Sequence, residues 1–110
     1  MPAISIWLDD IRKPPTYTDT DSWTWFETAE SVKQYIEENG IEGIDEISFD
    51  NDLGINKMEG YQLATWIEEY IELNQPKYIP VMWPHSANPV ARVQMDTIFT
   101  GIIKRRESNA

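Results

Sequence analysis

The chain has 110 residues, 41% of them hydrophobic, which is enough for one compact core, so we expect residues 1–110 to form a single domain. Its formal net charge of −10 repels phosphate backbones and anionic lipids, which excludes general DNA or RNA coating and a role on the membrane surface. The absence of cysteine excludes disulfides and thiolate chemistry. There is neither a membrane-length apolar stretch nor a signal-peptide pattern, so a cytoplasmic location is expected.

Apolar runs of strand length recur along the chain, and three of them end in polar residues. These three are residues 3–10, ending in Asp9 and Asp10, residues 46–52, ending in Asp50 and Asp52, and residues 77–86, ending in His85 and Ser86. A further strand is predicted at residues 23–27, and a weak last strand at residues 100–106.

Helical periodicity fills the intervals between these strands. Thr28 is a predicted N-cap, and Gly40 marks the end of the helix that follows it. Residues 60–74 carry apolar side chains at the spacing that is typical of an amphipathic helix. Asn88 is predicted to cap a third helix over residues 89–99. The chain is therefore expected to alternate strands with helices.

This alternation predicts an α/β fold with right-handed crossovers and a parallel sheet. Ligands bind such sheets beyond the carboxyl ends of the strands, where the loops converge. The polar residues that end the strands are therefore expected at one edge: Asp9, Asp10, Asp50, Asp52, His85 and Ser86. Several carboxylates favour Mg²⁺ or Mn²⁺ over Zn²⁺, with His85 as a borderline extra ligand.

Each of these patterns has an ordinary structural interpretation when it stands alone. A pair of acids such as Asp50 and Asp52 is common in turns, and a lone histidine more often makes structural hydrogen bonds than it catalyses a reaction. Three polar strand ends in one α/β order together favour a shared functional site.

At these residues the chain resembles a known family of folds. The order WLDD, ISFDNDLG, VMWPHSANP and IIKR resembles the response-regulator receiver domain, which has a flavodoxin-like parallel sheet of five strands. The resemblance implies, by position, an acidic pair at Asp9 and Asp10, a phosphoacceptor at Asp50, a hydroxyl site at Ser86 and a lysine at Lys104. The stretches WLDDIR, DNDLG, GYQLATWIEE and HSANPV are similar to cyclic-phosphate-processing receiver-like domains, which implies activity on cyclic phosphates.

Two features depart from the receiver pattern. Residues 11–22 contain two prolines and no apolar periodicity, so the first receiver helix is expected to be missing, and the chain stops soon after Lys104, so the last helix is expected to be missing too. Residues 4–8 alternate apolar and other side chains, whereas a strand covered on both faces reads apolar throughout. One face is therefore expected to be half covered, and self-association through the face that bears Trp7 is expected to give a homodimer.

The first functional hypothesis is a metal-dependent phosphoesterase. The cyclic phosphate, on an RNA end or in a small cyclic nucleotide, is what the family resemblance implies. An ion that polarises the phosphoryl oxygens and lowers the pKa of a bound water would be held by Asp9, Asp10, Asp50 and Asp52. His85 would protonate the leaving oxygen, while water or Asp50 attacks phosphorus. The candidate phosphate ligands are Arg12, Ser86, Asn88 and Lys104.

Two other hypotheses remain at this point. The chain could be a non-catalytic receiver-like signalling or protein-binding module that is phosphorylated at Asp50 or regulated through it. It could also be an acidic inhibitor that mimics nucleic acid, for which only the net charge of −10 speaks. His85 favours catalysis, because receiver phosphorylation needs no histidine beside the hydroxyl.

Overall fold

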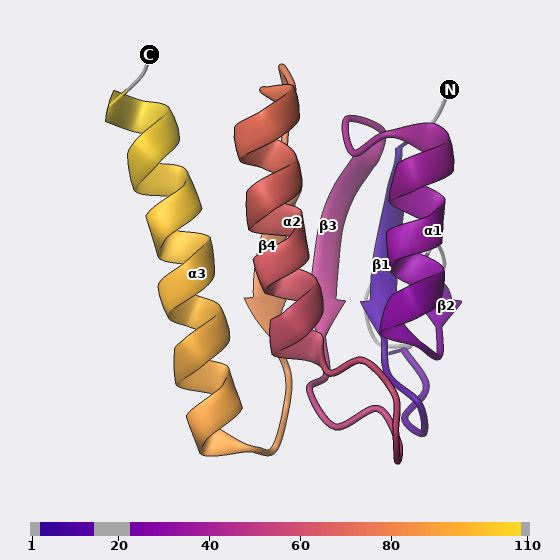
Figure 1. Ribbon diagram of the computed structural model, residues 1–110. Helices are drawn as coiled ribbons and strands as arrows, with labels where there is room; N and C mark the ends of the chain where they lie inside the picture. Colours follow the sequence, from indigo (N-terminus) through magenta and orange to yellow (C-terminus); the bar gives the residue numbers. More distant parts are fainter. Residues whose placement is uncertain (1–2, 15–22, 109–110) are drawn as a thin grey trace.

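The computed structural model describes residues 3–14 and 23–108, which form four strands and three helices. In chain order the elements are β1 (Ile4–Leu8), β2 (Trp23–Phe26), α1 (Ala29–Asn39), β3 (Ile44–Phe49), α2 (Gly60–Asn74), β4 (Val81–Pro84) and α3 (Pro89–Ser108). The strands form one parallel sheet in the order β2-β1-β3-β4. Figure 1 shows the helices in one layer in front of the sheet, with all carboxyl ends of the strands at its lower edge.

The expected α/β receiver-like fold is confirmed, but the strand predicted at residues 100–106 is wrong. These residues are the last turns of α3, so the described part of the chain has four strands where about five were expected. Buried residues of α3 recur every three or four positions, at Ala91, Met95, Phe99 and Ile102. That helical spacing continues through the Ile102–Ile103 pair, whose β-branched side chains had favoured a strand.

The predicted helix ends are found as expected. Thr28 Oγ1 accepts a hydrogen bond from the Ser31 N–H at 3.1 Å, and Gly40 ends α1 with a φ of 80°. At the start of α3, the Asn88 side-chain oxygen accepts hydrogen bonds from two backbone N–H groups, those of Val90 and Ala91, at 3.1 Å each. Both caps lie at the carboxyl edge of the sheet, because each helix starts where a strand has just ended (Figure 1).

The core lies between the sheet and the helix layer. Ile6 and Phe49 are fully buried on the helix side of the sheet, and Phe49 contacts Phe99 of α3 with ring centroids 4.9 Å apart. Full burial of a side chain of this size contributes roughly 1.5–3 kcal/mol. None of the helices within the described ranges combines the length and apolar character that crossing a membrane requires.

The opposite face of the sheet carries tryptophan and serine side chains. The register pairs Trp7 with Trp25 on one side and with Ser48 on the other, so all three project from this face. Trp23 packs edge-on between Trp7 and Trp83, at centroid distances of 5.7 and 6.1 Å. No helix among the described residues covers this face. Most of the segment expected to lack a helix, residues 15–22, lies outside the described residues.

The close approach of α2 to the end of β3 depends on Gly60. A Cβ atom added at Gly60 would lie 2.0 Å from the Asp50 carbonyl oxygen, so Gly60→Ala must separate the helix from the strand end. We expect a loss of about 1–3 kcal/mol in the free energy of unfolding, measured by urea denaturation.

Gly43→Ala is the matched control, because a Cβ atom there meets nothing within 4 Å. A Gly60→Ala variant as stable as Gly43→Ala would contradict this packing.

Candidate functional site

The carboxyl ends of three neighbouring strands are tied together at the position where the acids begin. The Asp9 N–H donates to the carbonyl of Phe26 at 3.1 Å, and the Asp50 N–H donates to the carbonyl of Leu8 at 2.9 Å. These bonds continue the sheet by one residue, and they fix the backbones of Asp9 and Asp50 on adjacent strands.

Three carboxylates gather at this edge. Asp9, Asp10 and Asp50 each offer an oxygen, and these oxygens all lie within 4.8 Å of one another. Burial, followed by the negative charges of Asp9 and Asp10, raises the pKa of Asp50 to about 6, although the Asn51 N–H bonds to its Oδ1 at 2.8 Å. Three carboxylate oxygens at this spacing fit a hard divalent cation, whose charge would offset the repulsion among them.

Asp9 connects this cluster to the rest of the site. Its carboxylate is 1% exposed, and Oδ1 accepts backbone N–H groups of Ile11 at 2.9 Å and Arg12 at 2.7 Å. Its other oxygen, Oδ2, lies 3.0 Å from His85 Nε2. The Trp25 indole N–H donates to the Asp9 carbonyl at 2.6 Å. Asp9 therefore has a fixed orientation before any ligand arrives.

His85 is held on three sides. Its Nδ1 lies 2.7 Å from Ser48 Oγ, and its ring stacks on Trp7 with centroids 3.9 Å apart and planes within 1° of parallel. Its backbone N–H donates to the Phe49 carbonyl at 2.8 Å, which fixes the residue after β4 against β3. Burial lowers the pKa of His85, and the hydrogen bond with Asp9 opposes this effect.

Three of the predicted phosphate ligands lie in loops at the same edge. The backbone N–H of Arg12 bonds to Asp9 Oδ1 at 2.7 Å, which places this residue beside the cluster, and its positive charge lowers the pKa of both Asp50 and His85 with a smaller effect than burial. Ser86 is buried, and its Oγ accepts the Asn88 N–H at 3.1 Å. Because the Asn88 side-chain oxygen caps α3, its amide nitrogen is the group left to donate to a ligand.

Two other predicted site residues are not brought to the cluster. Asp52 is exposed and absent from the group of clustered oxygens, and its Oδ1 accepts from Asn51 Nδ2 at 3.1 Å. Lys104 is exposed in the last turns of α3, at the opposite edge of the sheet from the acids (Figure 1). Its expected place depended on a fifth strand, and residues 100–106 are helical instead.

The structure adds two residues that the sequence did not indicate as site residues. Ser48 and Trp7 contact the His85 ring from β3 and β1. The signal in the sequence was the alternation within the strands, which assigns both to the face opposite the core. The hydrogen bond itself joins positions 37 residues apart, and no local pattern encodes it.

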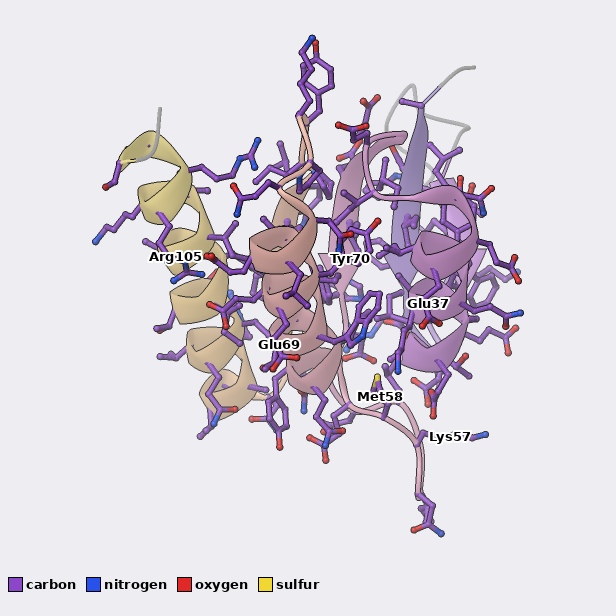
Figure 2. All side chains as sticks on the ribbon, turned by 45° about the horizontal axis from the view of Figure 1, so that its top comes forward. Glu37, Lys57, Met58, Glu69, Tyr70 and Arg105 are labelled. Carbon is purple, nitrogen blue, oxygen red and sulfur yellow. The ribbon has the colours of Figure 1, made fainter. Side chains whose placement is uncertain are left out.

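A second concave region lies away from this edge, between α2 and α3. It is a groove of about 580 Å³ whose cation, Arg105, is bound by Glu68 at 2.7 Å and Glu72 at 2.6 Å. Figure 2 shows Arg105 directed from α3 toward α2 and Lys57 pointing into solvent from the loop after β3. Arg105 is therefore engaged by carboxylates of α2, and Lys57 points into solvent, so neither is bound to the carboxylate cluster.

Comparison with known proteins shows the family to which the chain belongs. The family model described as cyclic-phosphate processing receiver domain matches residues 4–101, which include the clustered acids, His85 and Arg12. Comparison with curated proteins and with solved structures gives no match.

The crowded carboxylates predict a site that is unfavourable without a cation. Because the pKa of Asp50 in the folded protein, about 6, exceeds its ordinary 3.8, ionisation of this group opposes folding. This cost is absent below about pH 4, grows between about pH 4 and pH 6, and stays constant above that range. After solvent screening we expect Asp50→Asn to stabilise the metal-free protein by ~1–2 kcal/mol at pH 7. This is roughly 5 °C in melting temperature in EDTA, with almost no gain at pH 4.

Added Mn²⁺ should raise the melting temperature of the wild-type chain, because an ion bound only by the folded state stabilises that state. Asp50→Asn should lose this response, whereas the matched variant Asp52→Asn should keep it. If Asp50→Asn melts at or below the wild-type temperature in EDTA at pH 7, repulsion among the carboxylates does not destabilise the metal-free protein.

Proposed function

Because the chain belongs to the family of cyclic-phosphate processing receiver domains, we propose that it is a metal-dependent phosphoesterase that opens a cyclic phosphate. The observation that carries this proposal is the hydrogen bond between His85 Nε2 and Asp9 Oδ2, at 3.0 Å. This hydrogen bond links two groups. One is an imidazole that can transfer a proton near neutral pH, and the other is a cluster of carboxylates that fits a divalent cation. A receiver that only accepts a phosphoryl group has no use for this pairing.

The cation would be held by Asp9, Asp10 and Asp50, whose oxygens lie within 4.8 Å of one another. Mg²⁺ and Mn²⁺ both suit an all-oxygen donor set. When bound, the ion would polarise the phosphoryl oxygens and offset the charge that an anionic substrate adds to the acidic site.

The phosphate would be oriented by neutral and cationic donors of the surrounding loops. Arg12 can hold two phosphate oxygens through its planar guanidinium. The Asn88 amide nitrogen and the Ser86 hydroxyl supply further hydrogen bonds from the loop that starts α3. The N-terminal end of α3, which begins at Pro89, adds a favourable dipole for an anion.

The reaction would break one phosphorus–oxygen bond of the ring and form another to the attacking oxygen. The leaving oxygen, placed beside Asp9 Oδ2, would replace that oxygen as the acceptor of the Nε2–H of doubly protonated His85 and would take its proton, which returns the ring to its neutral form. Because burial lowers the pKa of His85, the doubly protonated form is a stronger acid than an exposed imidazolium. The attacking group is either water, which gives up its proton to a carboxylate, or Asp50, which would form an acyl phosphate that water then cleaves.

The proposed substrate is a cyclic phosphate on an RNA end or in a small cyclic nucleotide. A terminal phosphate needs only local contacts, so a net charge of −10 does not oppose its binding as it opposes binding along a nucleic-acid backbone. The proposal also includes a cytoplasmic location, where such substrates occur, and a single receiver-like domain over residues 1–110.

The proposed reaction is tested with a panel of 2′,3′-cyclic nucleotides, 3′,5′-cyclic nucleotides, RNA with a 2′,3′-cyclic end and linear diesters, each with Mg²⁺, Mn²⁺ or EDTA. Phosphorus NMR distinguishes the cyclic diester from the monoester product. We expect metal-dependent opening of a cyclic member, and a loss of about 10²–10⁴-fold in kcat for His85→Ala, because a proton donor is removed. Arg12→Ala should mainly raise KM, while Arg106→Ala, which removes a cation at the opposite edge, should change neither constant.

If no member of the panel is opened, the proposed reaction is wrong. The alternative function is a receiver-like signalling or protein-binding module that is phosphorylated at Asp50 or regulated through it. That module would accept a phosphoryl group from acetyl phosphate, keep it as an acyl phosphate on Asp50, and be equally well phosphorylated in His85→Ala.

We also propose that the chain forms a homodimer through the tryptophan face, meaning the face of the sheet that bears Trp7, Trp25, Val81 and Trp83. Trp25 is 38% exposed and Val81 is 66% exposed on this face. Two apolar surfaces of the same kind are most simply covered by a twofold pair of chains.

Sedimentation equilibrium at micromolar concentrations tests the dimer. Val81→Glu places a charge in the proposed interface and should weaken the dimer by roughly tenfold or more, equivalent to about 1.4 kcal/mol. Leu73→Glu makes the same change at a side chain that is 84% exposed on α2 and should leave the dimer intact. A wild-type chain that remains monomeric on concentration would exclude the dimer.

A further inference from the structure

Both ring nitrogens of His85 are engaged by protein groups. Asp9 Oδ2 lies 3.0 Å from Nε2, and Ser48 Oγ lies 2.7 Å from Nδ1 on the other side of the ring. The Asp9 carboxylate belongs to the candidate metal cluster, whereas Ser48 lies in β3 on the tryptophan face and has no place in the proposed reaction.

The direction of these two hydrogen bonds follows from the chemistry of the partners. A carboxylate can only accept, and Asp9 Oδ1 already accepts two backbone N–H groups, so a neutral His85 donates Nε2–H to Oδ2. Its Nδ1 is then an acceptor, and the Ser48 hydroxyl donates to it. If the ring gains a second proton, the same hydroxyl can rotate and accept from Nδ1–H.

Ser48 is not placed to act as a nucleophile, although serine, histidine and aspartate occur together here. The residue is 0% exposed, and it lies on the side of the imidazole away from Asp9 and the clustered carboxylates. A buried group at the Nδ1 edge of the ring can orient that ring without reaching a substrate.

We propose that Ser48 is a positioning residue that holds the His85 ring with Nε2 directed at Asp9. Stacking on Trp7 fixes the plane of the ring. It still permits a half-turn about the Cβ–Cγ bond, which keeps this plane and exchanges the two edges of the ring. The Ser48 hydrogen bond disfavours that half-turn. This inference rests on the proposed function, because the held nitrogen is the one that would serve the leaving oxygen.

The chain contains one histidine, so a long-range proton–nitrogen NMR spectrum of the imidazole reports this ring alone. In metal-free protein without substrate, we expect a single state at neutral pH with the proton on Nε2 and Nδ1 as a hydrogen-bonded acceptor. Ser48→Thr, which keeps the hydroxyl, should preserve this spectrum. Ser48→Ala should shift the Nδ1 resonance to that of an unbonded nitrogen and show a second ring orientation.

Ser5→Ala is the matched control. Ser5 is a buried serine on the same face, bonded to Glu46 at 2.7 Å, and its loss should leave the histidine spectrum unchanged. A wild-type ring protonated on Nδ1, or a Ser48→Ala spectrum identical to that of the wild type, would overturn the proposal. The wild-type spectrum alone shows which ring nitrogen carries the proton, so it tests the proposal even if a variant does not fold.

Kinetics provide a second readout on the substrate that the panel identifies. Ser48→Ala should lower kcat about 10–100-fold with little change in KM or in the Mn²⁺ dissociation constant, and Ser48→Thr should restore kcat. An unchanged kcat in Ser48→Ala would contradict the positioning role. If the wild-type chain opens no cyclic phosphate, the proposed function fails, but the spectrum still decides how the ring is held.

Discussion

The arrangement of this site depends on the repulsion among three carboxylates whose oxygens lie within 4.8 Å of one another. The parallel pairing of β1 with its neighbours forces this proximity, because hydrogen bonds beyond the strand ends fix the backbones of Asp9 and Asp50 side by side. Burial intensifies the conflict and raises the pKa of Asp50 to about 6. A protein that only needed to fold would place amides or hydroxyls here. The unfavourable charges are explained if a cation completes the site.

Asp9 transmits this constraint to the histidine. One of its oxygens is fixed by two backbone N–H groups of the following loop, and the other meets His85. The imidazole lies above the tryptophan face, stacked on Trp7 and bonded to Ser48. Because the described helices all lie on the other side of the sheet, this face is available to hold the ring (Figure 1). The one-sided helix layer and the histidine at the sheet edge therefore belong to the same arrangement.

Sequence reasoning succeeded where the information is local or follows from strand direction. Acids that follow apolar runs in an α/β order must meet at one edge of a parallel sheet, and Asp9, Asp10 and Asp50 do so. It failed for Lys104, because the isoleucines before it fit both a short strand and the end of a long helix, and only the burial of Phe99 and Ile102 on one face distinguishes the two. Ser48 could not be assigned, since its role comes from a contact with a residue 37 positions away.

The most direct test of the account is whether a cation occupies the carboxylate cluster beside the single histidine. Mn²⁺ is paramagnetic and broadens the NMR lines of nearby protons, so a titration locates the ion. We predict that substoichiometric Mn²⁺ erases the ring-proton signals of His85 while the methyl signals of Ile103, at the far end of α3, stay sharp. Sharp His85 signals at saturating Mn²⁺, with broadening confined to the groove lined by Glu68 and Glu72, would contradict the account.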